Sequence, residues 1–134
     1  VGQLYYSIIV DPQCEGLRIP SMIIQPLVEN AVLHGIVPSA RQGTCTVEIY
    51  REDDHLCIQV SDDGVGLSRE ILESVNRYIA GKANEEDKKK LGIGTRNVVD
   101  RIRYVYGASG SISVLSDAEW GTSITLMLPI EVNQ

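Results

Sequence analysis

The sequence predicts an α+β fold, a two-layer α/β sandwich in which a mixed, mostly antiparallel sheet has its helices packed on one face. Segments that are β-branched, or that alternate apolar and polar residues, recur along the chain as they do in strands. Between them lie segments with apolar residues at helical spacing. Strands joined by short turns form antiparallel neighbours. Helices on one face of such a sheet are the most economical way to bury both kinds of element.

Length and composition indicate one globular domain spanning residues 1–134, with 43% hydrophobic residues and a single core. No apolar run approaches the roughly 20 residues of a membrane span. The net charge of −6 argues against a nucleic-acid surface, which needs clustered positive charge. Cys14, Cys45 and Cys57 are odd in number and lack a C-x-x-C spacing, so we expect neither disulfides nor a zinc site. A reducing, cytoplasmic setting follows.

Five segments have the composition of strands. The first is Leu4–Val10, which is β-branched and aromatic. Thr44–Arg51 and His55–Ser61 both alternate apolar and polar residues and are so close in sequence that they predict a hairpin. Ser111–Ser116 and Thr122–Leu128 are joined by a tight connection and predict a second antiparallel pair.

The segment Ile19–Val37 predicts a helix with a broad apolar stripe. Pro26 lies inside this pattern and should kink the helix or mark its effective start, and Gly35 supplies the stop. Asn30 and His34 are four residues apart, so they share one face beside the stripe. Polar groups at that position need partners. Either they are hydrogen-bonded residues of an ordinary core helix, or Asn30 serves a divalent cation bound to phosphate oxygens.

A carboxylate followed by two glycines stands at the end of the third strand, in the run Asp62-Asp63-Gly64-Val65-Gly66. Glycines at this position let the backbone approach a ligand closely, although an ordinary turn would use the same residue types. Ser68 is the expected N-cap of the next helix. The apolar stripe of that helix consists of Ile71, Leu72, Val75 and Ile79.

The polar, charge-dense run Gly81–Leu91 has almost nothing that could pack, so we expect a mobile loop. The lysines at 88–90 are then a solvated charge run rather than three ligands. Gly92 and Gly94 lead into a helix over Thr95–Tyr106, whose N-terminus favours phosphate. Its expected inward residues are Val98, Val99, Ile102 and Val105.

Four motifs, in their order and spacing, resemble one known domain. They are QPLVENAVLHG, DDGVG, LGIGT and GTSITLMLP, and they extend over nearly the whole chain. This pattern resembles the GHKL or Bergerat-fold ATP-binding domain of gyrase B, the ninety-kilodalton heat-shock chaperone, the mismatch-repair ATPases and the histidine kinases. Within that family, QPLVENA followed by HG, and GIG followed by Asn-Val and an arginine, resemble the LytS/YesM-type sensor histidine kinases.

The resemblance implies a site for ATP and Mg²⁺. Asn30 would coordinate the Mg²⁺ that bridges the phosphates. Asp62, whose ionised carboxylate can only accept hydrogen bonds, would accept one from the adenine amino group. Gly64 and Gly66 would let the chain pass close to the base. Thr122 would lie behind adenine and join Asp62 and an ordered water.

The lid over the nucleotide is expected within residues 81–95, hinged at Gly92 and Gly94, whose amides would face the phosphates. Two positions depart from the family pattern. Many histidine kinases have a basic residue where this chain has Leu33, and Thr95 replaces the usual leucine; phenylalanine is absent altogether. Phosphate charge must then be met by other residues, and the candidates are His34, Lys82, a lid lysine and Arg96.

Three classes of function compete: a histidine-kinase catalytic domain, an anti-sigma-factor-type serine kinase or hydrolytic ATPase of the same fold, and a nucleotide-binding or interaction module without chemistry. The family's hydrolytic members and serine kinases place a glutamate four residues before the magnesium asparagine, because water or serine needs a general base. Here that position is Pro26, and Glu29 lies roughly 100° round the helix from Asn30. A neutral histidine needs no base, which favours the histidine kinase.

The resemblance also implies partners. We expect Asn30, with His34, to serve transfer of the γ-phosphate to a histidine on a separate dimerisation domain, outside this chain. A response regulator would receive the phosphoryl group next. The chain would be a cytoplasmic domain of a membrane-attached homodimer.

Overall fold

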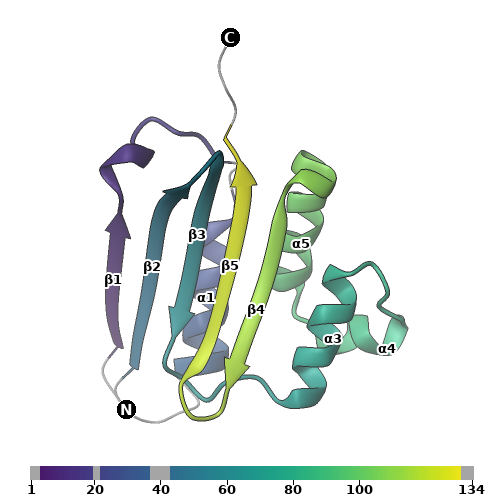
Figure 1. The fold of residues 1–134 in the computed structure, drawn as a ribbon. Helices are drawn as coiled ribbons and strands as arrows, with labels where there is room; N and C mark the ends of the chain where they lie inside the picture. The colour runs from purple at the N-terminus through teal and green to yellow at the C-terminus, as the bar shows by residue number, and fades with distance from the viewer. Residues whose placement is uncertain (1–3, 20–21, 37–42, 131–134) are drawn as a thin grey trace.

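The computed structural model describes residues 4–19, 22–36 and 43–130 of the chain. A single sheet of five strands forms one layer, in the order β1-β2-β3-β5-β4, and the helices form the other (Figure 1). The strands are β1 (Leu4–Val10), β2 (Gly43–Glu52), β3 (His55–Asp62), β4 (Ser111–Asp117) and β5 (Gly121–Pro129). The helical elements are η1 (Pro12–Cys14), α1 (Ile24–Asn30), η2 (Ala31–Ile36), α3 (Arg69–Ile79), α4 (Glu85–Lys90), α5 (Ile93–Tyr106) and η3 (Gly107–Ser109).

The sheet is mixed and mostly antiparallel, as the sequence predicts. β1 runs parallel to β2, while β2 with β3, β3 with β5, and β4 with β5 are antiparallel. The predicted hairpin between β2 and β3 is confirmed, and its turn contains Asp53 at φ 53°. At the end of β3, Asp62 is the ladder partner of Thr122 on β5, so their side chains leave the sheet on one face.

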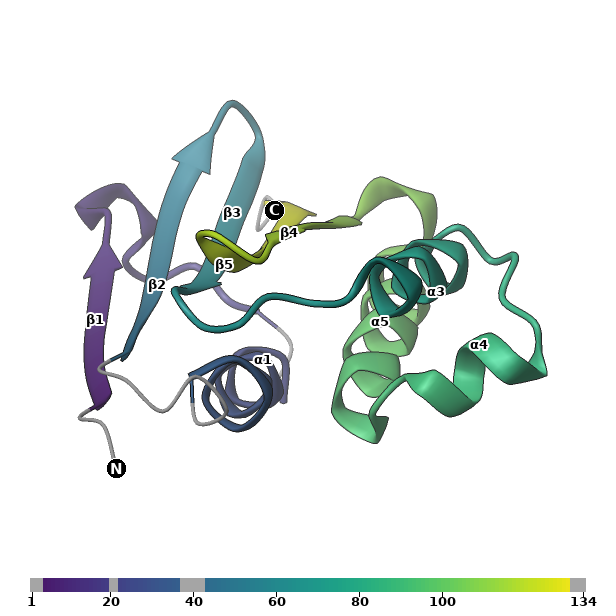
Figure 2. The same ribbon diagram turned by 90° about the horizontal axis from the view of Figure 1, so that it is seen from below.

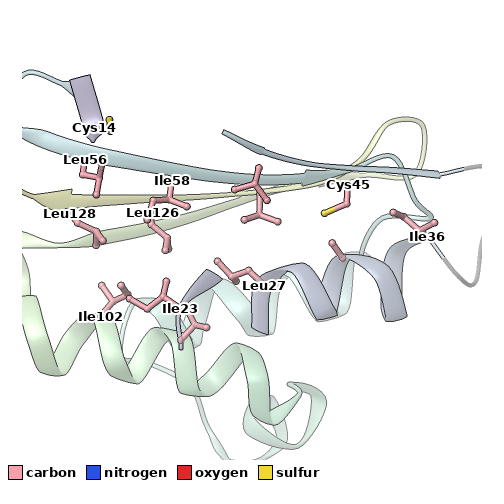
Figure 3. Close-up of a cluster of buried hydrophobic side chains, with 14 residues drawn as sticks. Cys14, Ile23, Leu27, Ile36, Cys45, Leu56, Ile58, Ile102, Leu126 and Leu128 are labelled. Carbon is pink, nitrogen blue, oxygen red and sulfur yellow. The ribbon is translucent and has the colours of Figure 1, made fainter. Parts of the chain in front are cut away.

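The helices cover one face of the sheet, as Figure 2 shows from below. The main core lies between that face and the two helices α1 and α5 (Figure 3). It includes Ile23, Leu27, Ile58, Ile102 and Leu126, all almost fully buried. A second, smaller cluster of Val75, Leu91 and Val114 lies under α3. None of the described helices is both long and apolar enough to cross a lipid bilayer.

The predicted first helix is shorter than its apolar pattern. α1 begins at Ile24, so Pro26 falls in the first turn. Backbone N–H groups there have no partner within the helix, so the N–H that proline lacks costs no hydrogen bond. From Ala31 to Ile36 the helix widens into a π-helical turn, a rare form that is frequent at functional sites. Gly35 lies within this turn rather than after it, and Val37 lies outside the described residues.

The prediction that residues 81–91 form a loop with almost nothing that could pack was wrong, because the segment contains α4 and buries Asp87. Asn84 caps this helix in a reciprocal capping box with Asp87, a device that satisfies the first backbone amides. The Asp87 side chain is only 2% exposed. It accepts hydrogen bonds from Ser74 Oγ at 2.9 Å, from Arg77 Nε at 2.9 Å and from Arg77 Nη2 at 2.6 Å. The ion pair between Asp87 of α4 and Arg77 of α3 thus connects the two helices.

The long helix α5 starts two residues earlier than predicted, with Gly92 as its N-cap and Gly107 (φ 59°) closing it. Three of its four predicted core residues are buried: Val98, Val99 and Ile102. Val105 is 42% exposed, and its prediction as an inward residue was wrong. Near the C-terminus of the helix only part of its apolar side remains covered by the sheet.

Candidate functional site

The helical layer and the sheet enclose a cavity of about 310 Å³ beside the main core. Its walls come from every layer of the fold and are mostly apolar. The residues from α1, η2, β3 and β5 are Leu27, Asn30, Ala31, Gly35, Val60, Asp62, Thr122 and Ile124. Those from α3, α4, α5, β4 and the connections are Gly66, Leu67, Ser68, Ile71, Val75, Lys90, Leu91, Gly92, Thr95, Val99, Ile112 and Val114. A cavity of this size and lining suits a flat organic group.

Asp62 places a carboxylate in this cavity although it is only 8% exposed. Burial raises the pKa of this carboxyl above its usual value, and the backbone amides of Gly64 and Thr122 oppose the rise by donating to it. The Gly64 amide lies 2.9 Å from Asp62 Oδ1. Two fixed donors thus hold a buried acceptor in place, and a ligand with a hydrogen-bond donor would complete its coordination.

Three glycines surround Asp62 at distances that no side chain could occupy. A Cβ on Gly35 would lie 2.5 Å from Asp62 Oδ1, and one on Gly64 would overlap the backbone of Gly35. A Cβ on Gly121 (φ 107°) would overlap the Asp62 carbonyl. The Gly35 carbonyl also accepts from the Val65 amide at 3.0 Å. The sequence interpretation used Gly35 only to end a helix; its place after Asn30 and His34 in the first motif was the available signal.

Thr122 lies beside Asp62, is 8% exposed and is held from behind by Ser116 of β4. The two hydroxyl oxygens are 2.8 Å apart. Ser116 Oγ also accepts from the Leu67 amide at 2.7 Å and donates to the Gly121 carbonyl at 3.2 Å. Nothing in the strand pattern distinguishes Ser116 from Ser113, so the sequence alone does not indicate a role for this serine.

Asn30, at the end of α1, meets the first turn of α5. Its Nδ2 donates to Thr95 Oγ1 at 2.8 Å. A Cβ added to Gly94 would lie 3.6 Å from the same amide, an ordinary van der Waals distance. Because the amide nitrogen is engaged by Thr95, the carbonyl oxygen is the atom with which Asn30 can bind a cation. The free amides at the start of α5, after Gly92, also favour an anion.

Of the candidate basic residues, Lys90 lines the cavity, while Lys82 and Arg96 do not. Lys90 Nζ lies 2.7 Å from Glu70 Oε1 at the surface. Lys82 is exposed just beyond the C-terminus of α3, where its amide donates to the Arg77 carbonyl. The described structure therefore favours Lys90, a lid lysine, over Lys82 as the positive charge at the cavity.

Six of the residues singled out in the sequence line the cavity together: Asn30, Asp62, Gly66, Gly92, Thr95 and Thr122. Gly64 and Gly94 are not among the lining residues. Gly64 lies tightly against the backbone of Gly35, whereas Gly94 lies near Asn30 with room for a Cβ between them. The backbone of His34 lies in η2, but its side chain lies outside the described part of the structure. Of the two glycines proposed as the lid hinge, Gly92 lies between α4 and α5, whereas Gly94 lies within the first turn of α5.

The arrangement combines apolar walls with acceptors on the Asp62 side and, on the Asn30 side, an amide, a helix N-terminus and a lysine. It suits a ligand that has a flat apolar ring with a donor edge and an anionic tail. Among the described residues, no three His, Cys, Asp or Glu side chains are grouped to hold a metal ion. A metal held by Asn30 would therefore depend on the ligand's own oxygens and on water, as Mg²⁺ commonly does.

Residues 17–132 match the family of histidine kinase-, DNA gyrase B- and HSP90-like ATPases. The sensor histidine kinase YpdA of Escherichia coli is 37% identical over 111 residues, covering 83% of this chain and 18% of that protein. The sensor histidine kinase YesM of Bacillus subtilis is 28% identical over 127 residues, covering 95% of this chain and 20% of that protein. The sensor protein LytS of Oceanobacillus iheyensis is 29% identical over 129 residues, covering 95% of this chain and 21% of that protein. The chain spans about a fifth of the length of these relatives.

Solved structures share the fold. The histidine kinase domain of a blue-light activated histidine kinase from Erythrobacter litoralis superposes with a TM-score of 0.69 and 15% identity, covering 97% of this chain and 56% of that one. The catalytic domain of histidine kinase ThkA superposes with a TM-score of 0.63 and 15% identity, covering 94% of this chain and 78% of that one. The predicted α+β architecture and the resemblance of the four motifs are confirmed.

Proposed function

The chain belongs to the family of histidine kinase-, DNA gyrase B- and HSP90-like ATPases, and on that premise we propose that it is the catalytic part of a sensor histidine kinase. In this role it binds Mg-ATP and donates the γ-phosphate to a histidine on a separate dimerisation domain. The observation that carries the proposal is the joint placement of Asp62, Thr122, Asn30 and Thr95 around one apolar cavity.

The cavity offers a matching group to each part of ATP. The exocyclic amine of adenine is a donor, and Asp62 is a buried acceptor whose position is fixed by Gly64. Apolar walls such as Val60 and Ile124 suit the faces of the ring. The amides at the start of α5 and the Lys90 ammonium suit the phosphates.

Asn30 is the residue that we assign to Mg²⁺, through its carbonyl oxygen. When bound, the ion supplies charge neutralisation at the phosphates. Asn30 contributes one neutral ligand, and the hydrogen bond to Thr95 holds that ligand's orientation. Gly94 lies near the same amide and has no side chain, which would leave space there for the phosphates.

Transfer to histidine is favoured over hydrolysis by the residues that flank Asn30. Four residues before it stands Pro26, which has no acid or base group. Glu29 is exposed and bonded to Gln25, whose Nε2 lies 3.0 Å from Glu29 Oε1, and it does not line the cavity. Water therefore meets no carboxylate base on this helix, whereas a neutral imidazole nitrogen is nucleophilic without one.

The rest of the proposed system lies beyond this chain. The partners are the dimerisation domain that bears the acceptor histidine and a response regulator that receives the phosphoryl group from it. We place the domain on the cytoplasmic side of a membrane-attached, homodimeric sensor, by similarity to relatives that are named sensor histidine kinases.

Calorimetric titration with ATP, with and without Mg²⁺, tests the binding step. Replacement of the carboxylate in Asp62→Asn should weaken ATP binding by roughly tenfold to a hundredfold, because a charge-assisted hydrogen bond is lost. Asn30→Ala should instead remove most of the enhancement that Mg²⁺ gives. ATP affinity unchanged in Asp62→Asn would exclude this residue from the site.

Labelled Mg-ATP tests the transfer step. The isolated domain should form little phosphohistidine of its own, because His55 lies at the start of β3 and does not line the cavity. It should hydrolyse ATP slowly, yet phosphorylate the dimerisation domain of its own parent when that domain is supplied separately. Rapid hydrolysis that Glu29→Gln abolishes would assign the protein to the hydrolytic branch instead.

A further inference from the structure

We infer that Ser116 is a specificity-determining residue, which makes the cavity select a purine with a 6-amino group over one with a 6-oxo group. It does so by fixing the direction in which the Thr122 hydroxyl points. This inference rests on the proposed adenine site and adds to it a residue on β4 that does not itself line the cavity.

The first step is a count of hydrogen atoms around Ser116. A serine hydroxyl has one hydrogen to donate and two lone pairs with which to accept. The Leu67 amide, 2.7 Å away, can only donate, so it uses one lone pair of Ser116 Oγ. The Gly121 carbonyl, 3.2 Å away, can only accept, so it takes the single hydrogen.

The second step sets the direction of the remaining contact. Ser116 Oγ and Thr122 Oγ1 are 2.8 Å apart, and with the serine hydrogen already used, Thr122 must be the donor. Thr122 then has no hydrogen left and offers lone pairs alone to the cavity. This assignment satisfies all three contacts of Ser116 at once, which the opposite direction does not.

The third step adds Asp62. Thr122 and Asp62 are ladder partners on adjacent strands, both are 8% exposed, and both line the cavity. An ionised carboxylate is also a pure acceptor. The wall that meets the ring edge therefore presents acceptors only, which suits an amino group and repels a carbonyl oxygen. Without Ser116, the Thr122 hydrogen could turn toward the ligand and donate to that oxygen.

The test compares the affinities of ATP and ITP, two nucleotides that differ in the group at position 6 of the purine and in the hydrogen that ITP carries on N1; because N1 is the same in every titration of ITP, a change of the affinity ratio between variants reports on the wall. Ser116→Ala should lower the ratio of the ATP affinity to the ITP affinity by about tenfold. The Thr122 hydroxyl can then donate to the 6-oxo group of ITP instead of repelling it. Ser116→Thr, which keeps a hydroxyl, should restore the ratio. Ser113→Ala is the matched control, because Ser113 is exposed on the same strand and points to the other side of the sheet.

The affinity ratio separates this role from a structural one. If Ser116 only holds the Leu67 segment in place, Ser116→Ala weakens the binding of both nucleotides equally and leaves the affinity ratio within twofold of that of the parent. That result would overturn this inference but not the proposed function. A parent that binds neither nucleotide would overturn the proposed function and this inference with it.

A second measurement needs no variant and so does not depend on the folding of Ser116→Ala. The parent should bind the triphosphate of unsubstituted purine riboside more tightly than that of 6-methoxypurine riboside, because a wall of acceptors repels the lone pairs of the 6-oxygen and neither base has a hydrogen on N1. Tighter binding of the 6-methoxy nucleotide would mean that the wall donates, and the inference would then be wrong.

Discussion

The side-chain amide of Asn30 donates to the hydroxyl of Thr95 across 2.8 Å, joining the end of α1 to the first turn of α5. The two residues are 65 positions apart in sequence. An asparagine amide can present either its nitrogen or its oxygen to a ligand, and this bond selects the oxygen. Thr95, which stands where the family commonly has leucine, thereby orients Asn30, the residue that we propose as the metal ligand.

Thr95→Val should reduce the Mg²⁺ enhancement of ATP binding by roughly fivefold, the effect of one neutral hydrogen bond. Valine keeps the shape of threonine but leaves the Asn30 amide free to rotate. Titrations of ATP with and without Mg²⁺ measure the effect, and Thr125→Val, the same replacement outside the cavity, is the control. An enhancement equal to that of the parent would show that the hydrogen bond does not orient Asn30.

Asp62→Asn should weaken ATP binding without lowering the thermal stability of the protein. Burial raises the pKa of the Asp62 carboxyl in the folded protein, so between its unfolded and folded pKa values the folded state holds more protons. Stability therefore falls as the pH rises through that window, and the penalty is complete above the folded pKa. The amide removes the penalty, so the variant should melt no lower than the parent at pH 7 while it loses ATP affinity.

Thermal denaturation at pH 7 and near pH 4 measures this difference. Toward pH 4 the parent carboxyl becomes protonated, so any advantage of Asp62→Asn should shrink. A melting temperature at pH 7 clearly below that of the parent would mean that the amide loses more from the Gly64 contact than it gains from neutrality.

Asp87→Asn should loosen α4 from α3. The amide cannot accept from Ser74 and Arg77 as the carboxylate does, and it leaves a guanidinium partly unpaired. We expect the melting temperature to fall by roughly 5 °C and trypsin to cut earlier within residues 81–91. Glu86→Gln, on the exposed side of the same helix, is the matched control because it affects only a surface pair with Lys89. Equal cleavage rates in the two variants would contradict the proposed fastening.

The contact between α4 and α3 should resist mild acid. The Arg77 guanidinium holds the pKa of the Asp87 carboxyl far below its usual range. A lowered acid pKa contributes stability that is complete above the unfolded value, about 4, and is lost only as the pH falls through the folded value. Amide exchange in α4 should therefore show the same protection at pH 7 and pH 5, and local loosening at pH 5 would argue against the pair.

The sheet and most of its helices could be predicted because their residues report on local structure. β1 has its predicted bounds, and Ser68 caps α3, its Oγ accepting from the Ile71 amide at 3.2 Å. By resemblance, the four motifs predict that Asp62 and Asn30 belong to one nucleotide site, and in the structure both residues line one cavity. These features depend on periodicity, capping residues and turn residues that are close in sequence.

The features that could not be predicted depend on contacts between distant residues. The run that forms α4 has no apolar stripe, and its burial depends on Arg77, ten residues before Asp87. The hydrogen bond of Asn30 to Thr95 and the contacts of Ser116 also join residues far apart in sequence. A charged run or a lone serine has the same local appearance whether it is solvated or buried against such a partner.

The packing of Gly35, Gly64 and Gly121 around Asp62 has a consequence for how this domain can evolve. Each glycine faces backbone or a carboxylate that cannot move aside, so in a saturation library even alanine should be depleted at these three positions. Substitutions at exposed Lys82, by contrast, should be tolerated. Sequence change around the Asp62 carboxylate is thus limited to coordinated multiple substitutions, while the exposed surface at residues 81–91 can change one residue at a time.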